Sequence, residues 1–227
     1  ASNELWDAQV NAILDATFHV RSVEETLEVQ QSRIQGVLDR IYLRALAVSN
    51  DKGDKLLIVS GDLCYIDSET FNEVAKLLEP HGYKPGSVIL AATHTHSSFG
   101  NYDHGFIARK FFGEYKSDRQ TTLMTHLTAV ALMADGNMEP AAISTAQKHV
   151  SGLNRSRLDP AFDIDEGGGQ PTQPPDPVKY PVDDRMLILK ITSAKTGRAL
   201  GAVFHFAAHP TVLSFKNFLF SPDWPGV

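Results

Sequence analysis

Two histidines stand one residue apart at the end of an apolar run, in the stretch AATHTHSSFG (residues 91–100). The apolar residues 88–90 before it predict a buried strand. Residues i and i+2 of a strand point to the same face, so we expect His94 and His96 side by side at its carboxyl end. Such a pair could hold a metal ion, or could divide metal binding and proton transfer between them. Two ordinary loop histidines are the alternative.

A second histidine pair, His205 and His209, occurs in the stretch FHFAAHPT (residues 204–211). The four-residue spacing suits a helix, but the β-forming residues and the closing Pro210 favour a strand. His209 then falls at a strand end, as His94 does, whereas His205 is more typical of a sheet histidine. Catalytic zinc sites use three protein ligands and an open position. His94 and His209 could supply two of them, and the residues show no obvious third.

Four further residues could take part in such a site. Asp62 follows the apolar run 56–59, so it could brace a metal-bound histidine or simply cap a helix or turn. Asp223 lies in the proline-flanked turn SPDWPG and could also point at the site. Arg155 could polarise a carbonyl, although a surface-loop arginine is the ordinary interpretation. Cys64 has no base or cation next to it in the sequence and is expected to be a buried thiol.

The composition excludes several classes of function. The chain has 227 residues, of which 42% are hydrophobic and 21% charged, as is usual for a globular protein. The net charge of −6 and the lack of a basic patch argue against a nucleic-acid partner. A single cysteine permits no internal disulfide, so cysteine usage does not indicate whether the protein works in an oxidising or a reducing compartment. No stretch approaches the roughly 18 apolar residues of a membrane helix.

Strand-like and helix-like segments alternate, which predicts an α/β fold with a central mixed β-sheet flanked by helices. The chain ends in a loop rich in aromatic residues, directly after a strand. We therefore expect residues 1–227 to form one incomplete α/β catalytic domain. It would be completed by the C-terminal part of the same protein or by a second chain. The expected helices are 5–14, 67–83 and 118–136, the expected strands are 15–23, 40–50, 54–63, 88–96, 141–150, 184–192 and 199–213, and 165–181 is a Pro/Gly-rich loop.

Six motifs in a fixed order resemble the neutral/alkaline (non-lysosomal) ceramidase family. They are GVLDRIYLRALAV, THTHS, NRS about sixty residues later, VDDRMLILKI, FHFAAHPT and SPDWPG. The resemblance implies a zinc-dependent amidase domain of α/β type that cleaves the N-acyl bond of ceramide. It also implies roles for four residues: His94 and His209 resemble zinc ligands, His96 the neighbouring catalytic histidine, and Arg155 the arginine near the reacting carbonyl. The family's remaining ligands, a glutamate and a tyrosine, and its reactive serine would lie beyond Val227.

Two departures from the family pattern concern the substrate. Residues 98–100 read Ser-Phe-Gly where the family usually has GPG, and HVRSVEETLE replaces the usual DITP ending of the first strand. The resemblance implies a lipid amide substrate presented at a membrane surface, and a secreted or periplasmic location. Two alternatives remain: another metallohydrolase that acts on a lipid ester or amide, or a non-catalytic homologue that binds a lipid or a partner.

Overall fold

The computed structural model describes residues 36–156, 158, 159, 176–213 and 217–226. The helix and strand expected within residues 5–23, and most of the Pro/Gly-rich loop, lie outside this part. The strands are β1 (Gly36–Val37), β2 (Leu43–Ser49), β3 (Lys55–Gly61), β4 (Val88–Ala92), β5 (Ala141–His149), β6 (Arg185–Ser193), β7 (Ala199–Phe206) and β8 (Leu219–Phe220). The helices are α2 (Ser68–Leu78), α3 (Phe106–Phe112) and α4 (Ser117–Gly136), with 3₁₀ turns η1 (Glu79–His81), η2 (Pro85–Ser87) and η4 (Trp224–Gly226).

A mixed sheet in the order β2-β3-β4 carries the candidate site at one edge. β2 runs antiparallel to β3, and β3 runs parallel to β4 with Gly61 opposite Ala92. Parallel strands end at the same edge, so the chain segments after Gly61 and after Ala92 leave the sheet together. The expected α/β class with a mixed sheet is therefore confirmed.

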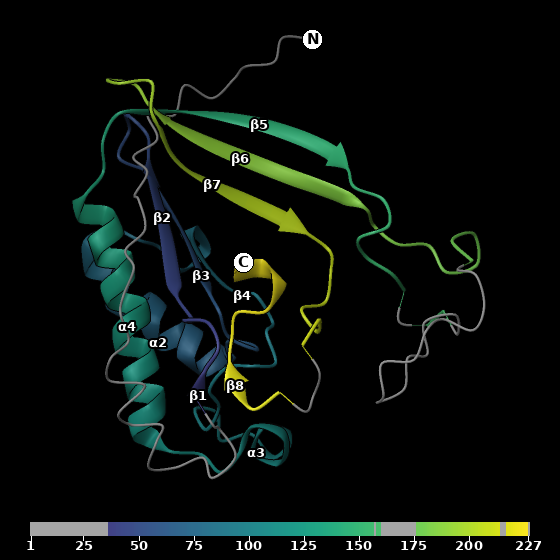
Figure 1. The fold of residues 1–227 in the computed structure, drawn as a ribbon. Coiled ribbons are helices and arrows are strands. Elements are labelled where there is room, and N and C mark those ends of the chain that lie inside the picture. Colours follow the sequence, from purple (N-terminus) through teal and green to yellow (C-terminus); the bar gives the residue numbers. More distant parts are fainter. Residues whose placement is uncertain (1–35, 157, 160–175, 214–216, 227) are drawn as a thin grey trace.

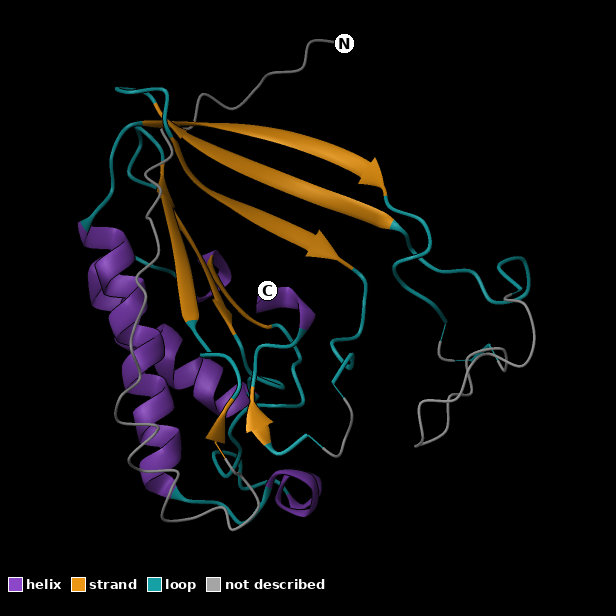
Figure 2. Ribbon diagram, viewed as in Figure 1, coloured by secondary structure: helices purple, strands orange, loops and turns teal. Residues whose placement is uncertain are grey.

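Helices α2 and α4 cover one face of this sheet (Figure 2). The predicted start of α2 is correct: the Asp67 carboxylate accepts hydrogen bonds from the Thr70 N–H at 2.9 Å and from its hydroxyl at 2.6 Å. On α4, Leu127 and Val130 are fully buried against the sheet. Burial of these apolar faces anchors the sheet that bears the site. Across the described residues, no helix is both long and apolar enough to cross a membrane.

A second, antiparallel sheet of β5, β6 and β7 arches over the first (Figure 1). The sequence led us to expect one central sheet, but the described strands fall into three, the third being the parallel pair β1 and β8. Within the second sheet, residues 194–198 form a short turn, which can join only antiparallel neighbours, so β6 and β7 pair antiparallel. The two larger sheets meet through one small apolar cluster of Leu46, Ala141, Ile191 and Leu200.

Leu127→Ala tests whether the α4 interface holds the sheet. The side chain is fully buried, so the variant should lose about 2–5 kcal/mol of unfolding free energy, measured by urea denaturation. Met133 lies on the same helix and is 42% exposed, so Met133→Ala should lose less than about 1 kcal/mol. Equal losses in the two variants would contradict this packing.

Candidate metal centre

Three imidazoles converge where β4 and β7 give way to loops. The ring centroids of His94 and His96 are 5.1 Å apart, and each lies 4.9 Å from the ring of His209. The Nε2 atoms of His96 and His209 are 3.1 Å apart, although the residues are separated by 113 positions in the sequence. The structure thus brings together the three histidines that the motifs singled out.

His94 reaches this cluster by a turn of the backbone and not by strand alternation. β4 ends at Ala92, so the expectation that His94 and His96 share a strand face is wrong. His94 has φ 69°, in the left-handed region, which costs a non-glycine residue about 1–3 kcal/mol. Its N–H donates to the Leu63 carbonyl at 2.8 Å, which continues the β3–β4 pairing beyond the strands. The turn swings the ring to the segment that follows β3.

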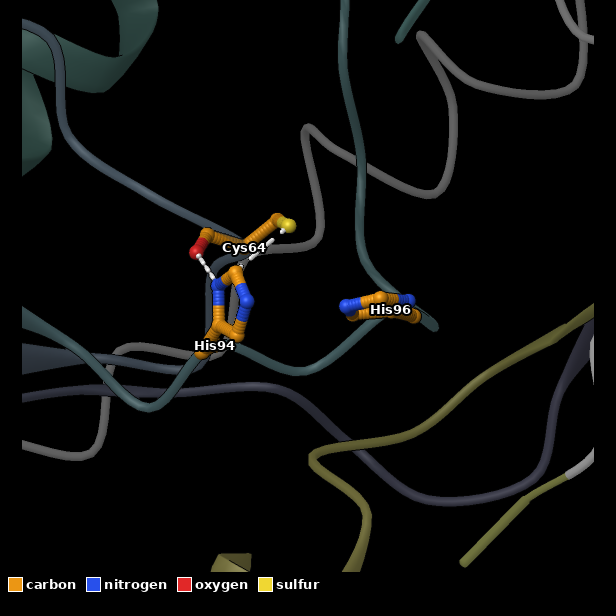
Figure 3. A group of neighbouring side chains, drawn as sticks. All are labelled: Cys64, His94 and His96. Atoms are coloured by element: carbon orange, nitrogen blue, oxygen red, sulfur yellow. Dashed lines mark hydrogen bonds between the residues drawn. The ribbon is translucent and has the colours of Figure 1, made fainter. Parts of the chain in front are cut away.

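The His94 ring is oriented by a backbone carbonyl. Its Nδ1 lies 2.5 Å from the carbonyl oxygen of Cys64 (Figure 3). A carbonyl only accepts hydrogen bonds, so Nδ1 carries the hydrogen and Nε2 keeps its lone pair for a metal. Sequence reasoning missed this contact because a main-chain carbonyl leaves no residue signature.

The loop that carries His94 and His96 is fastened through the residue between them. Thr95 is fully buried, and its hydroxyl donates to the Ser221 carbonyl at 2.8 Å. In return, the Ser221 N–H donates to the Ser97 carbonyl at 2.9 Å. Thr95 therefore points inward while both neighbouring histidines stay exposed.

Asp223 fastens the loop that carries His209. The side chain is 4% exposed and accepts hydrogen bonds from three backbone N–H groups. These belong to Val212 at 3.3 Å, Leu213 at 3.0 Å and Trp224 at 2.6 Å. Asp223 was predicted to support the metal ligands, and its hydrogen bonds run to the backbone beside His209 and not to an imidazole. Residues 221–223, which we call the clamp turn, thus hold both histidine loops.

Asp62 occupies a different position from the one expected. Its carboxylate accepts from the Tyr42 N–H at 2.8 Å and from Arg44 Nη1 at 3.1 Å, so it bonds to the β2 side and not to an imidazole. Burial raises the pKa of this carboxyl, and Arg44 offsets only part of that effect. The Asp62 carbonyl, however, accepts from the Ser98 hydroxyl at 2.8 Å. Asp62 therefore supports the histidine loop through its main chain.

Arg155 is exposed on the loop after β5, and its neighbour Asn154 ties that loop to the site. The Asn154 amide donates to the Asp183 carbonyl at 2.6 Å and to the Ala207 carbonyl at 2.8 Å. Ala207 lies two residues before His209, so the residue next to Arg155 is bonded to the His209 loop. Sequence reasoning considered only the arginine of the NRS motif, although the asparagine does the anchoring.

The donor atoms fit a zinc ion. Two imidazoles bound to one tetrahedral zinc at 2.0–2.1 Å would have ring centroids about 5 Å apart, and the rings of His94 and His209 are 4.9 Å apart. Cys64, His94 and His96 also offer one ligand atom each within 4.8 Å of one another. Burial raises the pKa of the Cys64 thiol, which makes it a poor nucleophile. His205, by contrast, is an exposed histidine within β7, opposite Leu187, as expected.

A family model described as "Neutral/alkaline non-lysosomal ceramidase, N-terminal" matches residues 28–227. The chain belongs to this family. Neutral ceramidase B of Dictyostelium discoideum is 26% identical over 196 residues, which make up 84% of this chain and 26% of that protein. Neutral ceramidase of Pseudomonas aeruginosa is 25% identical over 202 residues, covering 86% of this chain and 29% of that protein. The resemblance drawn from the motifs is confirmed.

Solved structures of the family share the fold. The crystal structure of the Pseudomonas aeruginosa neutral ceramidase superimposes with a TM-score of 0.69 at 21% identity, over 97% of this chain and 32% of that one. A ceramidase complexed with C2 gives the same TM-score at 22% identity. The chain thus spans about a quarter to a third of the length of the relatives that it matches.

The clamp turn predicts an energetic coupling between the two histidine loops. Thr95→Val removes the buried hydroxyl and should lower the unfolding free energy by about 1–3 kcal/mol. Because Asp223→Ala disrupts the same turn, the double variant should lose at least about 0.5 kcal/mol less than the sum of the single losses. Urea denaturation of the four proteins measures this.

Thr125→Val provides the matched control. That hydroxyl also donates to a carbonyl at 2.8 Å, but on the exposed surface of α4. Its effect should be small and should add to that of Asp223→Ala. Additive losses for Thr95→Val and Asp223→Ala would show that the two loops are held independently.

Proposed function

We propose that the chain is the N-terminal part of a zinc-dependent hydrolase that cleaves the N-acyl amide bond of ceramide or a related lipid amide. The observation that carries this proposal is the convergence of His94, His96 and His209 at one edge of the sheet. Membership of the ceramidase family and relatives named neutral ceramidase support the same reaction. In this account residues 1–227 are one portion of the catalytic domain.

His94 and His209 would hold the zinc. His94 offers Nε2, because its Nδ1 hydrogen is engaged by the Cys64 carbonyl. Bound zinc would polarise the amide carbonyl and lower the pKa of a bound water toward about 7. Two histidines are one short of the three protein ligands usual for catalytic zinc, so further donors are needed. The family resemblance supplies a glutamate and a tyrosine for this from outside the chain.

His96 would carry protons. Its ring is exposed, and its Nε2 lies 3.1 Å from that of His209. Imidazole exchanges protons near neutral pH, so His96 can take the proton of the attacking water and give it to the leaving amine. Arg155, whose neighbour Asn154 is bonded to the His209 loop, can stabilise negative charge that develops on the carbonyl oxygen.

The substrate class, the presentation of the lipid at a membrane surface and a secreted or periplasmic location follow from the family resemblance. The loop after His96 is a reason to assay substrates other than ceramide. Its Phe99 packs edge-on against Tyr102 with ring centroids 5.5 Å apart, and Ser98 bonds to the Asp62 carbonyl. This Ser-Phe-Gly loop replaces the family's usual GPG, so related N-acyl lipids and lipid esters belong in the same assay.

Single substitutions in the whole protein separate the roles of the two neighbouring histidines. His94→Ala should abolish both bound zinc and activity. His96→Ala should keep the zinc while the rate falls by about 10²–10⁴-fold, the usual range for a lost general acid or base. The measurements are metal content after dialysis and hydrolysis of a labelled ceramide. His205→Ala, on the exposed strand β7, is the control and should preserve both.

Two results would contradict the proposal. Loss of zinc in His96→Ala would make His96 a ligand, an arrangement that the short contact with His209 also permits. A zinc-loaded whole protein that hydrolyses no lipid amide or ester would be a non-catalytic homologue.

A further inference from the structure

Helix α3 turns its larger apolar side chains outward. Three of them are 66%, 70% and 78% exposed, in the order Phe106, Ile107 and Phe111. The opposite side of the helix packs on the protein: Ala108 is buried, and the Phe112 ring lies 4.9 Å from that of Tyr65. Single exposed apolar side chains are common, but a contiguous group of them marks an interaction site.

A lysine stands among these apolar side chains. Residues i, i+1, i+4 and i+5 share one side of a helix, so Lys110 lies on the same side as Phe106, Ile107 and Phe111. The Lys110 ammonium is 4.8 Å from the centroid of the Phe106 ring. Among the described residues, no ion pair joins Lys110 to a carboxylate. The outer side of α3 is therefore apolar with one positive charge at its centre.

This combination fits a lipid surface better than a protein surface. A protein that covered the apolar side chains would also take the Lys110 ammonium out of water, which costs free energy unless an acidic partner is supplied. At a bilayer surface, apolar and aromatic side chains enter the boundary between headgroups and acyl chains. The lysine stem can lie along them while its ammonium meets lipid phosphate.

α3 is tied to the loop that carries His96. The Asn101 N–H donates to the Phe112 carbonyl at 3.0 Å, and the Asn101 amide donates to the Glu114 carbonyl at 2.7 Å. Gly100, four residues after His96, lies so close to Phe112 that a Cβ there would overlap the Phe112 carbonyl oxygen. A bilayer that binds α3 is thus attached to the segment that carries the candidate site.

We propose that the outer side of α3 docks onto anionic lipid bilayers, with Phe106, Ile107 and Phe111 in the headgroup boundary and Lys110 on lipid phosphate. The inference rests on the proposed function, in which the lipid substrate is presented at a membrane surface. It adds which surface of the protein meets the membrane. Figure 1 shows α3 at the edge of the molecule opposite the β5–β7 sheet, so a bilayer on α3 would not meet that sheet.

Co-sedimentation of the whole protein with vesicles tests the docking without an activity assay. The probes are vesicles of phosphatidylcholine alone and of phosphatidylcholine with about one-third phosphatidylglycerol. The anionic vesicles should bind more tightly, although residues 1–227 carry a net charge of −6. Phe111→Ala should weaken binding to both kinds of vesicle by about tenfold or more. Lys110→Glu should remove the gain that phosphatidylglycerol gives.

Leu77→Ala is the matched control. Leu77 is 50% exposed near the end of α2, so this variant should bind vesicles as the wild type does. Because Phe111 is exposed, Phe111→Ala should unfold at the same urea concentration as the wild type and should still hydrolyse a short-chain, water-soluble lipid amide. A wild type that binds vesicles but hydrolyses no such amide would refute the proposed reaction and leave the docking intact.

Two results would overturn the docking. Equal vesicle binding by the wild type and Phe111→Ala would show that another part of the protein covers α3 or meets the membrane in its place. A gain from phosphatidylglycerol that persists in Lys110→Glu would show that lipid phosphate does not contact this lysine.

Discussion

The candidate site depends on the hydrogen bonds of the clamp turn, residues 221–223. On one histidine loop, Ser221 accepts a hydrogen bond from Thr95 and donates one to Ser97. On the other, the Asp223 carboxylate accepts from the backbone N–H groups of Val212 and Leu213. The two loops leave different sheets, and among the described residues those sheets meet at one small apolar cluster. Hydrogen bonds through a third segment therefore hold the three imidazoles with ring centroids 4.9–5.1 Å apart.

Hydrogen bonds also hold the two residues of the site that have strained backbone. His94 and Asp223 both have positive φ, 69° and 58°, and such backbone persists only where the surroundings determine it strongly. His94 is held through its N–H by Leu63 and through its ring by Cys64, and Asp223 is held by its own carboxylate contacts. These bonds offset a cost of about 1–3 kcal/mol at each residue. The site is thus ordered through buried backbone bonds, while the imidazoles remain open to a ligand.

Local patterns sufficed to predict much of the fold. The start of α2 and the apolar runs of β2, β3 and β4 are encoded within short windows, and each element is present. The convergence of the three histidines was also predictable, because polar residues follow strands that end near one another. The separation into three sheets was not, since it depends on which strands pair and pairing is a long-range property.

The features of the site that the sequence did not predict correctly share one cause. The expected face-sharing of His94 and His96 failed because the backbone turns after Ala92, and no residue type marks that turn. Asp62 bonds to Arg44. Strand pairing places Arg44 opposite Ser60, two residues before Asp62, so this partner depends on the pairing of β2 with β3. The His94 ring bonds to the main-chain carbonyl of Cys64, and the Asn154 amide donates to the main-chain carbonyl of Ala207. Sequence patterns show which side chains are available, but not which backbone atoms will meet them.

X-ray absorption spectroscopy at the zinc edge of the zinc-loaded whole protein tests the central claim most directly. The account predicts a first shell of nitrogen and oxygen at about 2.0–2.2 Å, with the multiple-scattering pattern of two imidazoles. It predicts no sulfur at about 2.3 Å, because Cys64 orients His94 through its carbonyl and leaves zinc to His94 and His209. A shell that contains sulfur, or one without two imidazoles, would contradict it.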